Sequence, residues 1–238
     1  MFARKQAFCT MKLIVTCEHG GNDIPKPFKK YFKDSTSVLN SHRGYDLGAL
    51  DIFKSLEPLA DYALYSETSR LLIELNRSLH HPKLFSEFTK GIPKQEKESI
   101  IQSHYLVYRN QVENTIKSWI DNGEAVLHIS MHSFTPILNK VERHCDLGLL
   151  YDSKKQGEKT FATNFKEDLK AQNPNLIVRF NYPYLGKADG FTTYLRKQFP
   201  SNYLGIEVEV NQKYAQHNQM HFEIKEVIIL ALKDLLTT

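Results

Sequence analysis

The chain of 238 residues has few cysteines, little net charge and no long apolar run. Its three cysteines, Cys9, Cys17 and Cys145, include no CxxC spacing, so we expect reduced thiols and no disulfide framework. No apolar run approaches the length that crosses a bilayer, which argues against a membrane protein. Internal repeats and low-complexity tracts are also missing, which argues against a solenoid or a disordered chain.

The charge balance and the N-terminal residues make further predictions about partners. The formal net charge is only +4, and the lysines are interspersed with acids, so no nucleic-acid partner is expected. A mild positive field is compatible with a small anionic substrate. Arg4 and Lys5 precede a stretch that is too short and too polar at its edges for a signal peptide, so we expect a cytoplasmic protein with no membrane partner.

The composition predicts a globular α/β protein. With 41% hydrophobic and 24% charged residues, the chain is long enough to form one domain over residues 1–238. Apolar runs predict strands, and apolar residues at helical spacing predict helices, in alternation along the chain. The expected strands are 12–17, 60–65, 70–75, 125–131, 146–152, 176–180 and 203–210, and the expected helices are 46–59, 98–120, 157–170, 190–198 and 217–235. Residues 82–97 have the composition of a loop that forms a mobile cover.

Polar residues follow or end several of these apolar segments. Residues 17–22 read Cys-Glu-His-Gly-Gly-Asn, residues 74–77 read Glu-Leu-Asn-Arg, and residues 132–134 read His-Ser-Phe. An open α/β sheet builds its site at the carboxyl ends of its strands, so we expect these groups to lie together.

Two of these polar groups are histidines that suit a metal site. A lone histidine more often caps a turn, but His19 and His132 both follow predicted strands, and two imidazoles leave a catalytic zinc one protein ligand short. Glu18, Asp23 and Asp46 are the nearby carboxylates. Glu18 is the strand neighbour of His19 and is expected on the opposite face. Asp46 is equally well explained as a charge in the first turn of a helix.

The segment from Arg70 to Arg77 suits the binding of a carboxylate. A guanidinium binds a carboxylate through two hydrogen bonds, and the amide of Asn76 completes the set. Surface ion pairs are the commoner use of a single arginine. In one straight strand the two arginines face opposite sides, so a bend near Asn76 is required for both to reach one site. Ser133 is placed to bind a neighbour or the substrate.

Glu207 stands in an otherwise apolar strand, which is costly for a carboxylate unless it is paired or functional. Beside a metal it suits the role of general base, and Glu209 on the same face competes for that role. Turn signals at residues 183–186 and 189–190 also suit the wall of a pocket.

Together these residues resemble the N-formylglutamate amidohydrolase family. Six stretches match the family's motifs in order over nearly the whole chain, at residues 17–25, 42–49, 69–77, 132–136, 146–150 and 205–212. The family is similar to the zinc carboxypeptidases and aspartoacylases. The resemblance implies an α/β, phosphorylase/hydrolase-like three-layer fold with a mixed central sheet flanked by helices. It also implies zinc-dependent hydrolysis of the amide bond of small N-acyl amino acids such as N-formylglutamate.

The resemblance also implies roles for individual residues. The wider group often takes its carboxylate ligand from the third position after the first histidine, where this chain has Asn22, so that role passes to Asp46. The chain also has Ser130 where some relatives have aspartate, and Glu74 where aspartate is usual. The implied zinc ligands are therefore His19, Asp46 and His132, the implied substrate-binding residues are Asn76, Arg77 and Ser133, and the implied catalytic residues are Glu207 and Arg70.

Two other functions remain open from the sequence. The first is a zinc carboxypeptidase-like peptidase acting on short peptides, for which we expect an open groove instead of a closed pocket. The second is a metal-free domain that binds carboxylated metabolites, which a metal assay separates from both enzymes.

Overall fold

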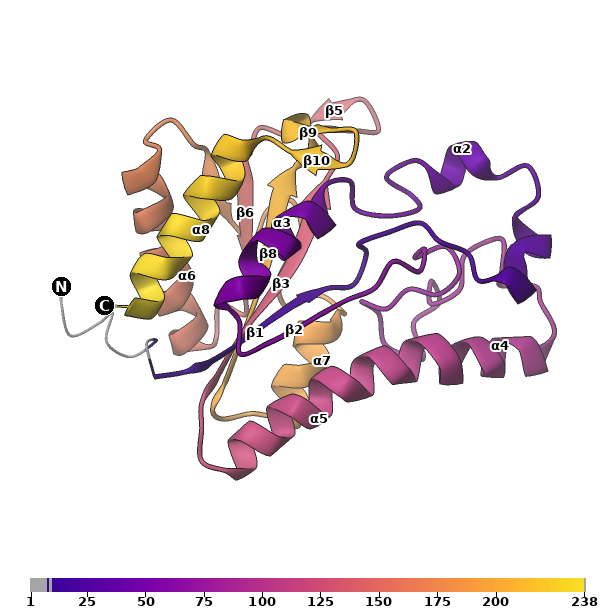
Figure 1. The fold of residues 1–238 in the computed structure, drawn as a ribbon, viewed down its shortest axis with the longest axis horizontal. Helices are drawn as coiled ribbons and strands as arrows, with labels where there is room; N and C mark the ends of the chain where they lie inside the picture. Colours follow the sequence, from indigo (N-terminus) through magenta and orange to yellow (C-terminus); the bar gives the residue numbers. More distant parts are fainter. Residues whose placement is uncertain (1–7, 9, 238) are drawn as a thin grey trace.

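A six-stranded mixed sheet forms the centre of the computed structural model, which describes residues 8 and 10–237 (Figure 1). The strands lie in the order β2-β1-β3-β8-β6-β7. All neighbouring pairs are parallel except β6 and β8, which are antiparallel. The predicted mixed α/β fold is therefore confirmed. The strand bounds are β1 Lys12–Cys17, β2 Tyr62–Tyr65, β3 Val126–Phe134, β6 Leu147–Leu150, β7 Val178–Phe180 and β8 Tyr203–Asn211.

Helices cover both faces of the sheet and give the molecule three layers (Figure 1). Side chains alternate between faces along β1, so Leu13 and Val15 pack with the first layer of helices and Ile14 with the second. The first layer holds α3 Ala49–Leu56, α6 Gln156–Gln172 and α8 Phe222–Thr237, and the second holds α5 Val107–Asp121 and α7 Phe191–Gln198. Because both faces are covered, nearly all residues of β1, β3 and β8 are buried, the polar ones included.

The helix predicted over residues 98–120 is part of a longer helical segment. It starts with α4 Lys94–Ile100, passes through a π-helical stretch at Ile101–Leu106 and continues as α5, as Figure 1 shows. π-helical turns are rare and usually occur as single insertions in α-helices. In this protein the insertion stands directly before the residues of α5 that face the sheet.

Short elements complete the fold. They are α2 Thr36–Leu39, 3-10 helices at Lys26–Phe32, Glu57–Leu59 and Gln212–Tyr214, and two hairpins, β4 Ile137–Leu138 with β5 Val141–Glu142 and β9 Ala215–Gln216 with β10 Gln219–Met220. Both hairpins turn through two residues with positive φ, Asn139–Lys140 and His217–Asn218, which matches the two-residue turns that fit the twist of a hairpin.

Four sequence predictions of secondary structure are wrong. The loop expected over residues 82–97 ends at Pro93, because α4 begins at Lys94. Residues 70–75 form turns instead of a strand, because the backbone N–H of Leu72 bonds locally to the carbonyl of Ser69 and none pairs with the sheet. Helix α3 starts at Ala49 and not at Asp46, since Gly48 before it has a left-handed φ of 76°. The last helix starts at Phe222 because the residues before it form the β9–β10 hairpin.

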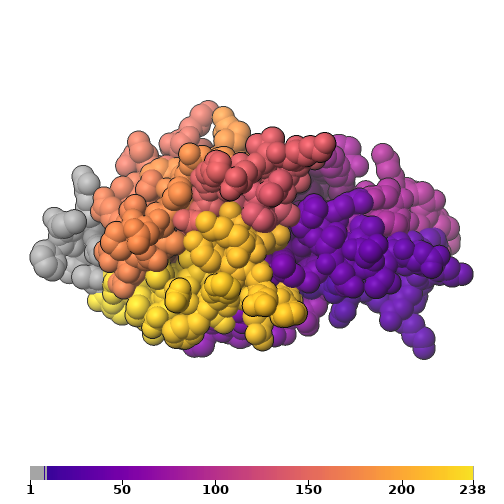
Figure 2. All heavy atoms as spheres, turned by 90° about the horizontal axis from the view of Figure 1, so that it is seen from above, coloured from indigo at the N-terminus to yellow at the C-terminus, as the bar shows by residue number. Residues whose placement is uncertain are grey.

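This C-terminal hairpin lies against the start of α3. The backbone N–H of Gly48 donates to Asn218 Oδ1 at 2.8 Å, and that of Met220 donates to Asp51 Oδ2 at 2.9 Å. Figure 2 shows the yellow C-terminal part and the indigo N-terminal part side by side on this face. The hairpin therefore fixes the turn that carries Asp46. No helix among residues 10–237 is both long and apolar enough to cross a membrane.

Candidate active site

The site lies at the carboxyl edge of the parallel part of the sheet. β1 and β3 are parallel neighbours, so His19, two residues beyond β1, comes close to His132 in the last part of β3. Asp46 reaches the same point from the turn before α3. All three side chains are buried.

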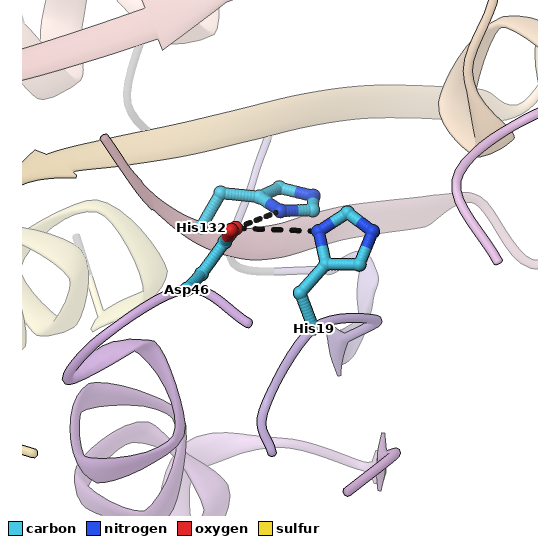
Figure 3. A group of neighbouring side chains, drawn as sticks. All are labelled: His19, Asp46 and His132. Atoms are coloured by element: carbon cyan, nitrogen blue, oxygen red, sulfur yellow. Dashed lines mark hydrogen bonds and ion pairs between the residues drawn. The ribbon is translucent and has the colours of Figure 1, made fainter. Parts of the chain in front are cut away.

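The three side chains converge on one point, as Figure 3 shows. Asp46 Oδ2 lies 3.3 Å from His19 Nδ1 and 2.9 Å from His132 Nδ1. One ligand atom from each residue lies within 4.8 Å of the others. Two imidazoles and one carboxylate are a donor set of the kind that catalytic zinc uses, with a further position left for water or substrate.

A carboxylate also stands behind each histidine. His19 Nε2 is hydrogen-bonded to Glu74 Oε1, and His132 Nε2 lies 3.2 Å from Glu18 Oε2 and 2.9 Å from Ser130 Oγ. Metal-binding histidines usually have their second ring nitrogen held in this way, which fixes the ring and raises its basicity. The donor set therefore fits a metal ion.

Glu18 is not one of the converging ligands. It is fully buried, and its carboxylate accepts hydrogen bonds from Tyr108 of α5 at 3.0 Å and from Ser130 at 2.6 Å. Glu18 thus lies on the α5 side of the sheet and holds the outer nitrogen of His132. The sequence predicts Glu18 on the face opposite His19 and assigns it no role, although its place directly before His19 indicates that it lies near the site.

The charges of the site hold one another in place. Burial alone raises the pKa of Asp46, but His19, Arg70 and His132 bring the pKa well below its ordinary value. Burial lowers the pKa of His132, but its bonds to Asp46 and Glu18 raise the pKa well above the ordinary value. Arg70 donates to Asp46 Oδ1 at 3.0 Å and to Glu74 Oε2 at 2.6 Å. Arg70 therefore orients the carboxylate of Asp46 and the carboxylate behind His19.

All eight residues named as site residues from the sequence line one cavity of about 290 Å³. The loop between β7 and α7 supplies the opposite wall through Tyr184, Leu185, Ala188 and Asp189, so the pocket wall expected from the turn signals is confirmed. The complete lining is His19, Asp46, Arg70, Asn76, Arg77, His132, Ser133, Tyr184, Leu185, Ala188, Asp189, Glu207 and Glu209.

Asn76 and Arg77 are held on the side of the cavity next to α7. Asn76 Oδ1 accepts a 2.6 Å hydrogen bond from the backbone N–H of Phe191, and its Nδ2 lies 3.4 Å from His132 Nε2. Arg77 Nη1 donates to the backbone carbonyl of Asp189. Ser133 donates to the carbonyl of Leu47 at 2.8 Å, which ties β3 to the turn that carries Asp46.

The two glutamates of β8 have different surroundings. Glu207 Oε1 accepts a 2.5 Å hydrogen bond from Thr192 Oγ1 in the first turn of α7. Glu209 is opposite His132 in the strand register, and its Oε2 is buried without a hydrogen-bond partner among the described residues. Burial raises the pKa of Glu209 to about 8. Thr192, which holds the carboxylate of Glu207, is a residue that the sequence did not reveal.

Solved structures share this fold. A protein from Agrobacterium tumefaciens has a TM-score of 0.76 and 22% identity, with 99% of this chain and 97% of that chain covered. The N-formylglutamate amidohydrolase from Ralstonia eutropha JMP134 has a TM-score of 0.67 and 14% identity, with 95% and 92% covered. Among curated protein sequences, none matches.

The fold and the site define an α/β protein with a mixed central sheet and a candidate metal centre at the carboxyl edge of that sheet. The sequence model of N-formylglutamate amidohydrolase matches residues 11–215, which include every residue of the cavity. The chain therefore belongs to the N-formylglutamate amidohydrolase family, as its motifs predicted.

Proposed function

We propose that this protein is a zinc-dependent amidohydrolase that cleaves the amide bond of small N-acyl amino acids such as N-formylglutamate. The observation that carries the proposal is the convergence of two histidines and one aspartate on the wall of a cavity that also holds two arginines and two glutamates. Each of these groups has a defined task in amide hydrolysis.

His19, Asp46 and His132 would hold the zinc ion, with Glu74 and Glu18 fixing the two rings from behind. A bound zinc ion supplies Lewis-acid chemistry, which polarises an amide carbonyl and makes a water molecule more acidic. Arg70 keeps Asp46 in place through its 3.0 Å hydrogen bond.

Glu207 is the proposed general base. Its carboxylate is oriented by the Thr192 hydroxyl at 2.5 Å and lines the cavity. It accepts a proton from the attacking water and then passes that proton to the nitrogen of the departing amine. Burial raises the pKa of Glu209, and its Oε2 has no hydrogen-bond partner among the described residues that would orient it, so Glu207 is the better-placed base.

The two arginines have separate tasks. Arg70 keeps 28% of its side chain exposed at the cavity, where its charge stabilises the oxyanion of the tetrahedral intermediate. Arg77 and Asn76 bind the α-carboxylate of the substrate, because a guanidinium and an amide match the geometry of a carboxylate. Ser133 contributes a polar group to the same wall.

The size of the cavity supports a small substrate. Its volume of about 290 Å³ is at the lower end of the range for ligand sites, which favours an acyl amino acid over a longer peptide. The test is a screen of N-formyl, N-acetyl and N-succinyl amino acids and of short peptides, with and without added zinc, measured as release of the free amine. Zinc-dependent release from the acyl amino acids supports the proposal. Cleavage of the peptides alone would favour a peptidase, and binding without turnover would favour a metal-free binding domain.

A further inference from the structure

The feature that this function leaves unexplained is a buried arginine on α5. Only 4% of Arg109 is exposed, and among the described residues its hydrogen bonds go to backbone carbonyls and it forms no ion pair with a carboxylate. Burial brings the pKa of Arg109 below its ordinary value. A buried charge without an ionic partner is costly unless other contacts compensate for the lost hydration.

Aromatic rings surround the guanidinium. Its central carbon lies 4.1 Å from the ring centre of Phe191, 4.7 Å from that of Tyr194 and 4.9 Å from that of Tyr105. These are cation–π contacts, which partly offset the lost hydration and fix the plane of the guanidinium.

The hydrogen bonds of Arg109 go to the backbone on both sides of Asn76. Its Nη1 donates to the carbonyl of Leu75 at 3.0 Å and to that of Arg77 at 3.3 Å. Tyr105, one turn earlier, donates to the same Arg77 carbonyl at 2.7 Å. This segment has no strand or helix to satisfy its carbonyls, so Tyr105 of the π-helical stretch and Arg109 of α5 take the place of the missing backbone partners.

Phe191 connects Arg109 to the side chain of Asn76 as well. The backbone N–H of Phe191 donates to Asn76 Oδ1 at 2.6 Å, and its ring lies against Arg109. Arg109 thus contacts both parts of the structure that hold Asn76. These are the backbone on either side of Asn76 and Phe191 at the start of α7. Arg109 itself does not line the cavity.

We propose that Arg109 is a positioning residue that fixes Asn76 and Arg77 for the substrate carboxylate. The inference rests on the proposed function, in which these two residues bind that group. Removing Arg109 releases the carbonyl of Leu75 and loosens that of Arg77, which displaces the side chains between them from the carboxylate. A small displacement of the two side chains weakens substrate binding, because the strength of hydrogen bonds to a carboxylate depends on their geometry.

The test compares an N-acyl amino acid with its α-amide in the Arg109→Met variant. We expect KM for the acid to rise about tenfold, with KM for the amide and kcat within about threefold of the unmodified protein, because only the acid uses the carboxylate contacts. Val112→Ala is the matched control. Val112 is a fully buried apolar residue of the same helix, so this variant loses stability but keeps the ratio of the two KM values.

Tyr105→Phe keeps the inference testable if Arg109→Met does not fold. It removes one hydrogen bond to the Arg77 carbonyl, and we expect a smaller rise of about threefold in KM for the acid. Arg109 has no positioning role if Arg109→Met and Tyr105→Phe, or whichever of them folds, keep the ratio of the two KM values of the unmodified protein while Arg77→Ala changes it. The proposed function stands in that case. If Arg77→Ala keeps the ratio too, the carboxylate-binding role itself is wrong, and the inference is overturned with it.

Discussion

Replacing Glu207 by glutamine is the sharpest test of the proposed chemistry. The Thr192 hydroxyl donates to Glu207 Oε1 at 2.5 Å, and an amide oxygen accepts the same hydrogen bond. The substitution therefore keeps the shape of the side chain and its main contact. It removes the one property that the proposal uses, the capacity to take a proton from water.

The expected loss follows from that single change. General bases contribute about 10²- to 10⁴-fold to rates, so we expect kcat of Glu207→Gln to fall at least a hundredfold. KM stays within about threefold, because no substrate-binding group is altered. The assay measures amine release at several substrate concentrations, and zinc per chain is measured on the same protein, where it stays unchanged.

Glu209→Gln is the matched control on the same strand. Glutamine keeps the shape of Glu209, and the Oε2 that it replaces has no hydrogen-bond partner among the described residues. We expect kcat within about threefold of the unmodified protein. The reasoning is refuted if Glu209→Gln loses the rate and Glu207→Gln keeps it. Loss of zinc from Glu207→Gln would instead make Glu207 a metal ligand.

Three further predictions test other parts of the site. His19→Ala and His132→Ala lose zinc on dialysis while Glu207→Gln retains it, and full zinc content in both histidine variants would mean that the metal binds elsewhere. Arg77→Ala raises KM about tenfold for an acyl amino acid but not for its amide, since hydrogen bonds to a charged group are lost, and an equal rise for both compounds would contradict this. Burial lowers the pKa of His128 from 6.5 to about 4, so the folded chain resists a proton that the unfolded chain accepts, and stability falls as the pH drops from 6.5 towards 4. The loss is about 3 kcal/mol at 1.36 kcal/mol per pKa unit. In urea unfolding the stability of His128→Gln depends less on pH over this range, and an unchanged pH dependence would contradict the prediction.

The sequence alone determined the alternation of strands and helices and the edge of the sheet where the site lies. Apolar runs such as residues 12–17 and 203–210 are local signals, and the structure has strands at both places. Neighbouring parallel strands have their carboxyl ends at the same edge of the sheet. Polar residues after β1 and in the last part of β3 therefore lie close together for any conformation of the connecting loops. His19 and His132 were therefore identifiable as one pair. The family motifs supplied Asp46, Arg70, Asn76 and Arg77 as their companions.

Only the tertiary structure decided how these residues are held. The carboxylates behind the histidines, Glu74 and Glu18, act through contacts between residues that are 55 and 114 positions apart. Arg109 of α5 donates to the carbonyls of Leu75 and Arg77, more than 30 residues earlier in the chain. Propensity and periodicity depend on residues that are close in the sequence. The contacts of Glu74, Glu18 and Arg109 depend instead on how distant segments without regular structure pack against a helix or strand. The segment 70–77 is the clearest case, because its apolar residues resemble a strand, but its backbone bonds within itself, to other loops and to Arg109 of α5.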